Sequence, residues 1–449
     1  MRMISRLLVR GNLVRFQHAV GAVRWQSSRK QAPVLTAAPV RALVDEQISI
    51  KGRFLPPHSP VTVCARMHCE DGDLWEAFAH YNTNAGGAVN LTTDHSLGGS
   101  YLGCEPMGLF WGLQPAPGGR QGIRLKKNDV ETPYQVHISL MEGHVSPSDG
   151  KSSELAVVTT ERWYMAPGVK RTEIRQNGVV GTLFLPPGPG PFPGVLDMWG
   201  MGGGLPEYRS SLLASKGYAS LTLSYIEHKD LPGPPDQLNV GDSYFRSAYQ
   251  LLQDLDEVDA DRIGLIGLSY GVYVSLRIAT QCGVKPSCVI CINGPFASTI
   301  PYPEDGFSKH NDSTEKYYVC NDQGYVQFKD AMLPTHLALE HRVKLENLAC
   351  PLMVIVAEDD GMAASSKYAD MMEEILKSAG KSQLFTRLSY PDAGHLIEPP
   401  YSPHARESFY RVKPQKLMIV FGGHPASHAA AQEDSWRKML DFLETNLRR

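Results

Sequence analysis

Four residues of this chain have types and an order that could do chemistry together. Ser269 lies at the centre of a Gly-Leu-Ser-Tyr-Gly segment, Asp359 and Asp360 come later in the chain, and His395 follows them. A serine hydroxyl is a weak nucleophile near neutral pH, so a histidine must take its proton during attack on a carbonyl, and a buried carboxylate must orient that histidine. The set therefore predicts acyl transfer through a covalent intermediate on Ser269, with His395 as general base.

The two aspartates compete for the role of the orienting carboxylate. Asp360 is favoured because it lies further out on the loop that follows residues 351–357. In the alternative, Asp359 orients the histidine and Asp360 is solvated.

The elements that would position these residues are strands of a mostly parallel sheet. The apolar run at residues 263–266 precedes the serine and a helical pattern follows it, as in the strand-to-helix turn of a nucleophile elbow. Residues 351–357 and 384–390 predict two buried strands, with a helix at 366–381 between them. Because the carboxyl ends of parallel strands share one edge of the sheet, the acid and the histidine should meet there. This order of serine, acid and histidine predicts an α/β-hydrolase fold.

An oxyanion hole would complete the site. One donor should be the backbone amide of Tyr270, which follows the nucleophile, and the second that of Met201 or Gly202, in the glycine-rich loop after the strand predicted at residues 194–199. A flexible loop or a phosphate cradle is the alternative. The loop lacks the lysine and Ser/Thr of a P-loop, however, and the spacing of a dinucleotide fingerprint.

The catalytic part is predicted to occupy residues 160–449, after a different kind of domain. Residues 42–145 contain short alternating runs separated by Gly, Pro and Asp, which predicts an all-β sandwich. A polar stretch at 146–153 is expected to link the two domains. Residues 1–40 are rich in arginine and contain no acidic residue, which is typical of a mitochondrial transit peptide. A disordered tail or a misassigned start codon is the alternative interpretation.

Composition narrows the classes of function. A net charge of −3 gives no electrostatic reason to expect nucleic-acid binding, and no apolar run reaches the roughly 20 residues that span a bilayer, so no integral membrane protein is expected. No cofactor and no metal site is predicted. Cys288 and Cys291 lie inside a strand-like run without a second ligand pair, and His424 and His428 are interpreted as cap and surface residues.

Several further segments carry a family resemblance. The chain resembles the type I acyl-CoA thioesterase family, which also contains the bile acid-CoA:amino acid N-acyltransferases. The resemblance covers nearly everything from about residue 42 to 447, and its most specific segments are residues 97–101, 105–108, 191–194, 202–209, 212–219 and 394–401. It implies a front sandwich domain, a catalytic α/β-hydrolase domain and an acyl-CoA substrate.

The resemblance also bears on individual residues. It implies a triad of Ser269, Asp360 and His395, and its spacing between acid and histidine favours Asp360 over Asp359. The thioesterases of the family usually have lysine where this chain has Tyr270. The family's acyltransferases have cysteine at the elbow, so a serine favours hydrolysis of fatty acyl-CoA. Conjugation of the acyl group to glycine or taurine is the alternative function, and a simple carboxylesterase is a third.

Two expectations concern location and substrate contacts. The chain ends without the Ser-Lys-Leu signal of some relatives, and its basic leader favours the mitochondrial matrix, with the cytosol as alternative. Arg209 and Lys216 are candidates by charge for binding CoA phosphates, although a solvated surface position is expected for either.

Overall fold

The structure is a computed structural model that describes residues 31–149, 153–234, 238–298, 318–337, 341–412 and 415–449. Pro33–Arg449 form one compact unit. Most of the expected transit peptide, residues 1–30, lies outside the described residues. Among the helices of the described part, none is long and apolar enough to cross a membrane.

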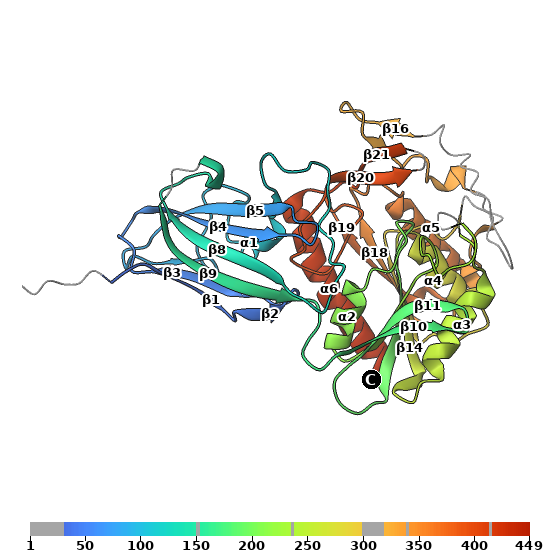
Figure 1. Cartoon of the computed structure of the whole chain (residues 1–449). Coiled ribbons are helices and arrows are strands. Elements are labelled where there is room, and N and C mark those ends of the chain that lie inside the picture. The colour runs from blue at the N-terminus through green and yellow to red at the C-terminus, as the bar shows by residue number, and fades with distance from the viewer. Residues whose placement is uncertain (1–30, 150–152, 235–237, 299–317, 338–340, 413–414) are drawn as a thin grey trace, which may run out of the picture. The chain divides into compact units, whose positions relative to one another are not determined.

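An eight-stranded sheet forms the centre of the catalytic part (Figure 1). Its first two neighbouring pairs are antiparallel and the other five are parallel. This is the α/β-hydrolase arrangement, and it confirms the predicted fold class. In spatial order the strands are β10 (Lys170–Gln176), β11 (Val179–Leu185), β13 (Ala219–Leu223), β12 (Phe192–Met198), β14 (Val258–Leu268), β15 (Cys288–Ile292), β18 (Leu352–Ala357) and β19 (Phe385–Tyr390).

Helices cover both faces of this sheet, which explains why its central strands are apolar on both sides. Successive residues of β15 enter different cores: Ile290 packs in the cluster of α2 and α6, whereas Val289 and Cys291 pack in the cluster of α3, α4 and α5. Cys288 and Cys291 are fully buried in this strand, as core packing predicts. The helices are α2 (Tyr208–Ser215), α3 (Asp242–Gln253), α4 (Tyr270–Gln281), α5 (Ser365–Ser378) and α6 (Pro425–Leu447).

The front part consists of two smaller sheets. In β8 alternate residues are buried, with Tyr134, Val136, Ile138 and Leu140 pointing inward. The six-stranded sheet contains β2 (Arg41–Leu43), β9 (Glu154–Trp163), β8 (Tyr134–Glu142), β4 (Pro60–His68), β5 (Leu74–Asn82) and β7 (Gln114–Pro115). The three-stranded sheet contains β1 (Val34–Ala38), β3 (Ser49–Arg53) and β6 (Val89–Asn90), and a short helix, α1 (Gly108–Trp111), follows.

The front sheets extend beyond the predicted boundaries of 42–145. Strand β9 pairs with β8 from Tyr134 opposite Arg162 to Met141 opposite Glu154, so the polar stretch at 146–153 connects two strands of one sheet and is not the link between domains. A loop between two strands and a linker between two domains are both rich in polar residues, so composition alone does not distinguish a loop from a linker. Strand β1 also lies inside the predicted leader, 1–40, and pairs with β3.

A fourth sheet lies beside the catalytic part. It contains β16 (Val319–Cys320), β17 (Val326–Gln327), β21 (Gln415–Val420) and β20 (Glu407–Val412). A loop of the front part contacts it, because the amide of Phe409 donates to the carbonyl of Gly122 at 2.8 Å.

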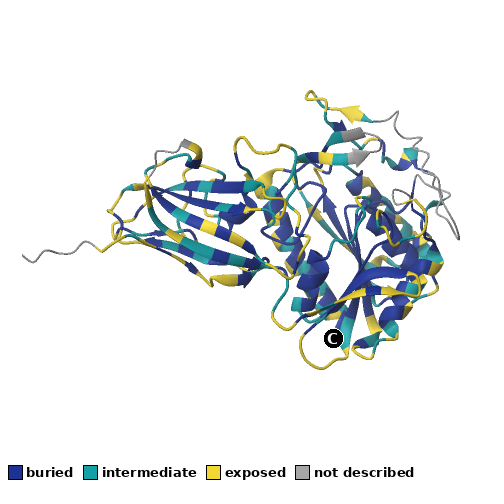
Figure 2. Cartoon of the chain, in the orientation of Figure 1, coloured by how far each residue is buried: buried dark blue, intermediate teal, exposed yellow. Residues whose placement is uncertain are grey.

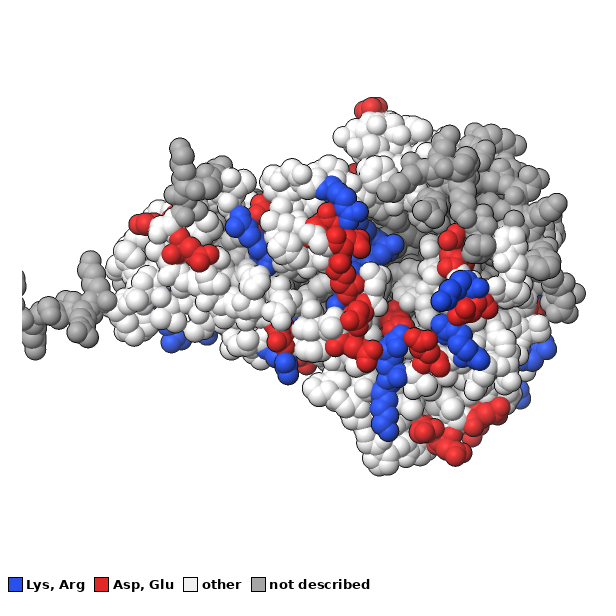
Figure 3. Space-filling model, viewed as in Figure 1, with Lys and Arg blue, Asp and Glu red and all other residues white. Residues whose placement is uncertain are grey.

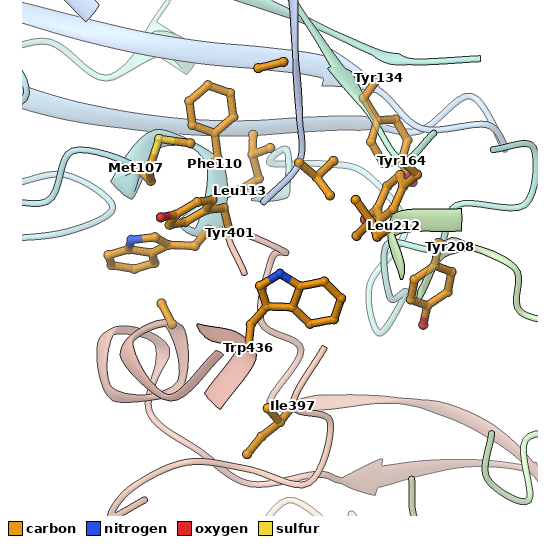
Figure 4. Packing of buried hydrophobic residues seen from close by; sticks show 14 of the residues in the cluster. Met107, Phe110, Leu113, Tyr134, Tyr164, Tyr208, Leu212, Ile397, Tyr401 and Trp436 are labelled. Atoms are coloured by element: carbon orange, nitrogen blue, oxygen red, sulfur yellow. The ribbon is translucent and has the colours of Figure 1, made fainter. Parts of the chain in front are cut away.

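The front sheets and the α2/α6 face of the central sheet share one hydrophobic core. Phe110, Tyr134 and Tyr164 of the front part belong to the same buried cluster as Trp436 of α6 and Tyr401 (Figure 4). Figure 2 shows that strands of both the front sheets and the central sheet carry buried residues. Acidic and basic side chains are interspersed on the face in Figure 3, in keeping with the small net charge.

Candidate active site

Ser269 sits on the sharp turn between β14 and α4. Its backbone has φ 57° and ψ −125°, a conformation that a residue with a side chain rarely adopts. Both flanking glycines are needed for close packing: a Cβ at Gly267 would lie 2.2 Å from the carbonyl oxygen of Gly271, and one at Gly271 would lie 2.5 Å from that of Met198. The amide of Ser269 donates to the carbonyl of Ile292 at 2.9 Å, which ties the turn to β15.

Asp360 and His395 form a buried pair at the ends of β18 and β19. Nδ1 of His395 lies 2.9 Å from Oδ2 of Asp360, and both side chains are almost completely buried. The same carboxylate accepts from the hydroxyl of Ser365 at 2.6 Å and from the amides of Met362 and Ala363 at 2.7 and 3.0 Å. Because an ionised carboxylate only accepts hydrogen bonds, Nδ1 must donate, and Nε2 is left as the basic nitrogen.

Asp359 faces a different direction. Its carboxylate accepts from the amide of Gly423 at 2.8 Å and lies 3.2 Å from Nη1 of Arg406, and half of its side chain is exposed. The geometry therefore separates the two aspartates: Asp360 contacts the histidine, and Asp359 does not.

The glycine-rich loop after β12 lies against Ser269. A Cβ at Gly200 would come within 2.8 Å of Cβ and 3.2 Å of Oγ of Ser269. The amides of the next two residues of the loop, Met201 and Gly202, have no hydrogen-bond acceptor among the described residues, and neither does the amide of Tyr270, the first residue of α4. These are the three amides that the sequence nominated for the oxyanion hole.

Asn293, which follows β15, was missed as a site residue. Its Nδ2 donates to the carbonyl of His395 at 2.7 Å, and its Oδ1 accepts from the amide of Ala357 at 2.7 Å. It is buried and has a φ of 47°. An Asn at the carboxyl end of a parallel strand was the available signal, since such ends border the crevice in open α/β sheets.

His428 was assigned wrongly to the surface. It is 1 % exposed, and its ring stacks on the ring of His404 with a distance of 4.1 Å between the ring centroids. His424 is exposed at the N-cap position of α6, as expected, without a side-chain capping bond. Helical spacing placed both residues on one helix but could not show that a distant loop covers only one of them.

Neither Arg209 nor Lys216 is a solvated cation. Arg209 is buried, donates from Nε to Asp197 at 2.9 Å and lies over the ring of Trp199. Lys216 forms an ion pair of 2.8 Å with Asp45 of the front part. The expected surface position is therefore wrong for Arg209, whereas Lys216 is partly exposed and its charge is paired with Asp45.

A buried polar network links the front part to the histidine loop. Nη1 of Arg124 lies 2.7 Å from Oε1 of Glu398, and the hydroxyl of Tyr208 donates to the same oxygen at 2.5 Å. Burial acts against the charge of Arg124, but Glu398 raises the pKa of this guanidinium above its ordinary value. Since Glu398 comes three residues after His395, this network fixes one end of the loop.

Comparisons with known proteins agree with this architecture. Residues 45–176 match the family model described as "Acyl-CoA thioester hydrolase/BAAT N-terminal region", and residues 241–449 match "BAAT / Acyl-CoA thioester hydrolase C terminal".

Curated relatives match over most of their length. "Acyl-coenzyme A thioesterase 2, mitochondrial" of Mus musculus is 36 % identical over 95 % of this chain and 92 % of its own. "Bile acid-CoA:amino acid N-acyltransferase" of Mus musculus is 37 % identical over 92 % of this chain and 97 % of its own. "Acyl-coenzyme A thioesterase 5" of the same organism is 38 % identical over 90 % and 94 %. The chain therefore belongs to the family of acyl-CoA thioester hydrolases and bile acid-CoA:amino acid N-acyltransferases.

Proposed function

We propose that this protein hydrolyses fatty acyl-CoA thioesters to free fatty acid and CoA through an acyl-enzyme on Ser269. The observation that carries the proposal is the buried contact of 2.9 Å between Nδ1 of His395 and Asp360, which leaves Nε2 as a base, together with a serine in the strained turn of an elbow. The relatives that are named acyl-coenzyme A thioesterases support an acyl-CoA substrate.

In the first half-reaction the hydroxyl of Ser269 attacks the thioester carbonyl and passes its proton to Nε2 of His395. The amide of Tyr270 and that of Met201 or Gly202 donate to the developing oxyanion. The tetrahedral intermediate collapses, the bond to sulfur breaks, and His395 gives the proton to the leaving CoA thiolate, which departs as the thiol.

In the second half-reaction His395 takes a proton from water, which attacks the ester carbonyl of the acyl-enzyme. Collapse of the second intermediate releases the fatty acid and restores the hydroxyl of Ser269. Water is the expected acceptor because the acyl-enzyme on serine is an oxygen ester. A cysteine acyl-enzyme would still be a thioester, which amines attack far more readily.

The test is acyl-CoA turnover across a chain-length series, following free thiol with and without glycine or taurine. Thiol release matched by free fatty acid and unaffected by amine supports hydrolysis. An amide product would instead establish the N-acyltransferase activity named in other relatives. Ser269→Ala should lower turnover by about 10⁵- to 10⁶-fold, and near-normal activity would refute the nucleophile.

We propose further that the protein acts in the mitochondrial matrix. The basic, acid-free leader and the word "mitochondrial" in one relative's name support this location. N-terminal sequencing of the protein from purified mitochondria should find a start between about residues 25 and 33, before strand β1 (Val34–Ala38), which pairs with β3. An intact leader, or absence of the protein from the organelle, would contradict the proposal.

A further inference from the structure

His428 contacts the backbone on both sides of His395. The amide of Gly394 donates to Nδ1 of His428 at 3.0 Å, and Nε2 of His428 lies 2.9 Å from the carbonyl oxygen of Leu396. One imidazole, in the first turns of α6, thus bridges the two residues that flank the histidine of the site.

These two contacts determine the protonation state of the ring. An amide N–H can only donate, so Nδ1 of His428 must be an unprotonated acceptor. A carbonyl can only accept, so Nε2 must bear the proton. The ring is therefore neutral and in the Nε2–H tautomer, and a second proton would place two donors opposite each other at Gly394.

The surroundings favour this neutral state. Burial lowers the pKa of His428 well below its ordinary value, the neighbouring His404 lowers it further, and the bond to Leu396 acts in the opposite direction. Burial likewise lowers the pKa of His404 to about 4, so the stacked partner is neutral at pH 7 as well.

The peptide groups of His395 itself are held by other residues. Its amide donates to the carbonyl of Phe421 at 2.9 Å, and its carbonyl accepts from Asn293. Without His428, the amide of Gly394 and the carbonyl of Leu396 would lose these side-chain partners in a buried segment. The strand-end loop would then be free to shift relative to Ser269.

We propose that His428 is a positioning residue that fixes the loop bearing His395 by bridging the peptide groups on either side of it. The inference rests on the proposed role of His395 as general base. His428 touches no reacting atom and acts only through the orientation of His395, for which a displacement near 1 Å can cost about 10²-fold in rate.

Three substitutions separate the two contacts. His428→Ala removes both, His428→Asn keeps an acceptor near the position of Nδ1, and His428→Gln keeps a donor near that of Nε2. Met439→Ala is the matched control, because Met439 is buried in the same helix and has no recorded hydrogen bond to this loop. The readouts are kcat and KM for acyl-CoA, and the rate at which a fluorophosphonate probe labels Ser269.

We expect His428→Ala to lower kcat and the labelling rate of the folded protein by about 10- to 100-fold, with KM changed less than about threefold. His428→Asn and His428→Gln should each recover part of the loss. Met439→Ala should lower stability and leave the labelling rate within about threefold of wild type.

Two failures can be distinguished. If Ser269→Ala and His395→Ala abolish labelling while the His428 variants label like the wild type, the positioning role is overturned and the proposed site stands. If His395→Ala labels normally, the proposed site fails, and the role of His428 with it. Where His428→Ala does not fold, wild-type rates in both the Asn and the Gln variants overturn the inference.

Discussion

Replacement of Asp360 by asparagine tests the site where its geometry is most specific. The carboxylate accepts four hydrogen bonds, from His395, Ser365 and two loop amides, and the nearly isosteric Asn can keep only some of them. If its oxygen accepts from the amides, its NH₂ group faces Nδ1 of His395. The imidazole must then reverse its tautomer, with the proton on Nε2, where it cannot accept the proton of Ser269.

The size of the effect follows from this reversal. In a well-studied Ser-His-Asp triad, the same Asp-to-Asn substitution leaves the geometry intact and lowers kcat by about 10⁴-fold. At about 1.36 kcal/mol for each tenfold change, this corresponds to about 5.4 kcal/mol of lost transition-state stabilisation. Loss of one hydrogen bond to a charged group contributes only about 1.5 to 3 kcal/mol, so the tautomer must supply the rest.

The assay is release of free thiol from acyl-CoA, with folding checked by circular dichroism. Asp359→Asn is the matched control, because that neighbour is half exposed and contacts Arg406 and Gly423 instead of the histidine. We expect the control to keep activity within about threefold. The reasoning is refuted if Asp359→Asn loses activity while Asp360→Asn retains it.

Gly200→Ala should lower kcat by about 10- to 100-fold, because its Cβ would lie 2.8 Å from Cβ of Ser269 and displace the serine side chain. The measurement is kcat for acyl-CoA turnover. Arg124→Met should lower the free energy of unfolding by about 3 kcal/mol in denaturant titrations, because it leaves the buried carboxylate of Glu398 without its cation. The fold lowers the pKa of His404 to about 4. Between about pH 6.5 and 4 the unfolded state therefore binds more protons than the folded state, and the free energy of unfolding should fall by about 3 kcal/mol as the pH is lowered through this range. Urea titrations at several pH values across the range measure this loss.

Each of these predictions has a control. Gly202→Ala should be tolerated, since no atom of the described residues lies within 4 Å of its added Cβ and alanine keeps the backbone amide. Equal losses at both glycines would contradict the steric argument. Adding Glu398→Gln to Arg124→Met should recover part of the lost stability, and strict additivity of the two changes would argue against a direct pair. In His404→Phe the loss of unfolding free energy between about pH 6.5 and 4 should be smaller. An unchanged dependence of the unfolding free energy on pH would assign the loss to other groups.

The α/β-hydrolase fold and the meeting of Asp360 with His395 were accessible from sequence because their signals are local. The glycines around Ser269 and the apolar runs before Asp360 and His395 lie within a few residues of the positions that they define. Parallel pairing then places the ends of β18 and β19 at one edge without knowledge of any side-chain contact. The α/β-hydrolase fold followed from the same runs.

The features that were missed depend on contacts between distant segments. His428 is buried because the loop of His395 folds over α6. Arg209 is buried beside Asp197, whose carboxylate accepts its hydrogen bond and balances its charge. Asn293 contacts a carbonyl that lies 102 positions away in the chain. The residue types at these positions are also common at the surface, so only the packed structure distinguishes a buried position from an exposed one.

The shared core also constrains how this protein can change over evolutionary time. The front sheets bury their aromatic residues against α6 and against Tyr401, close behind the loop of His395. Replacing the front domain with that of a relative would therefore require matching replacements on the catalytic side of the same core. We expect the wild-type protein to unfold in one cooperative transition, and a chimaera without those matching replacements to lose stability and activity together. The two domains are thus expected to behave as one unit of stability, although only one of them contributes the serine, the aspartate and the histidine.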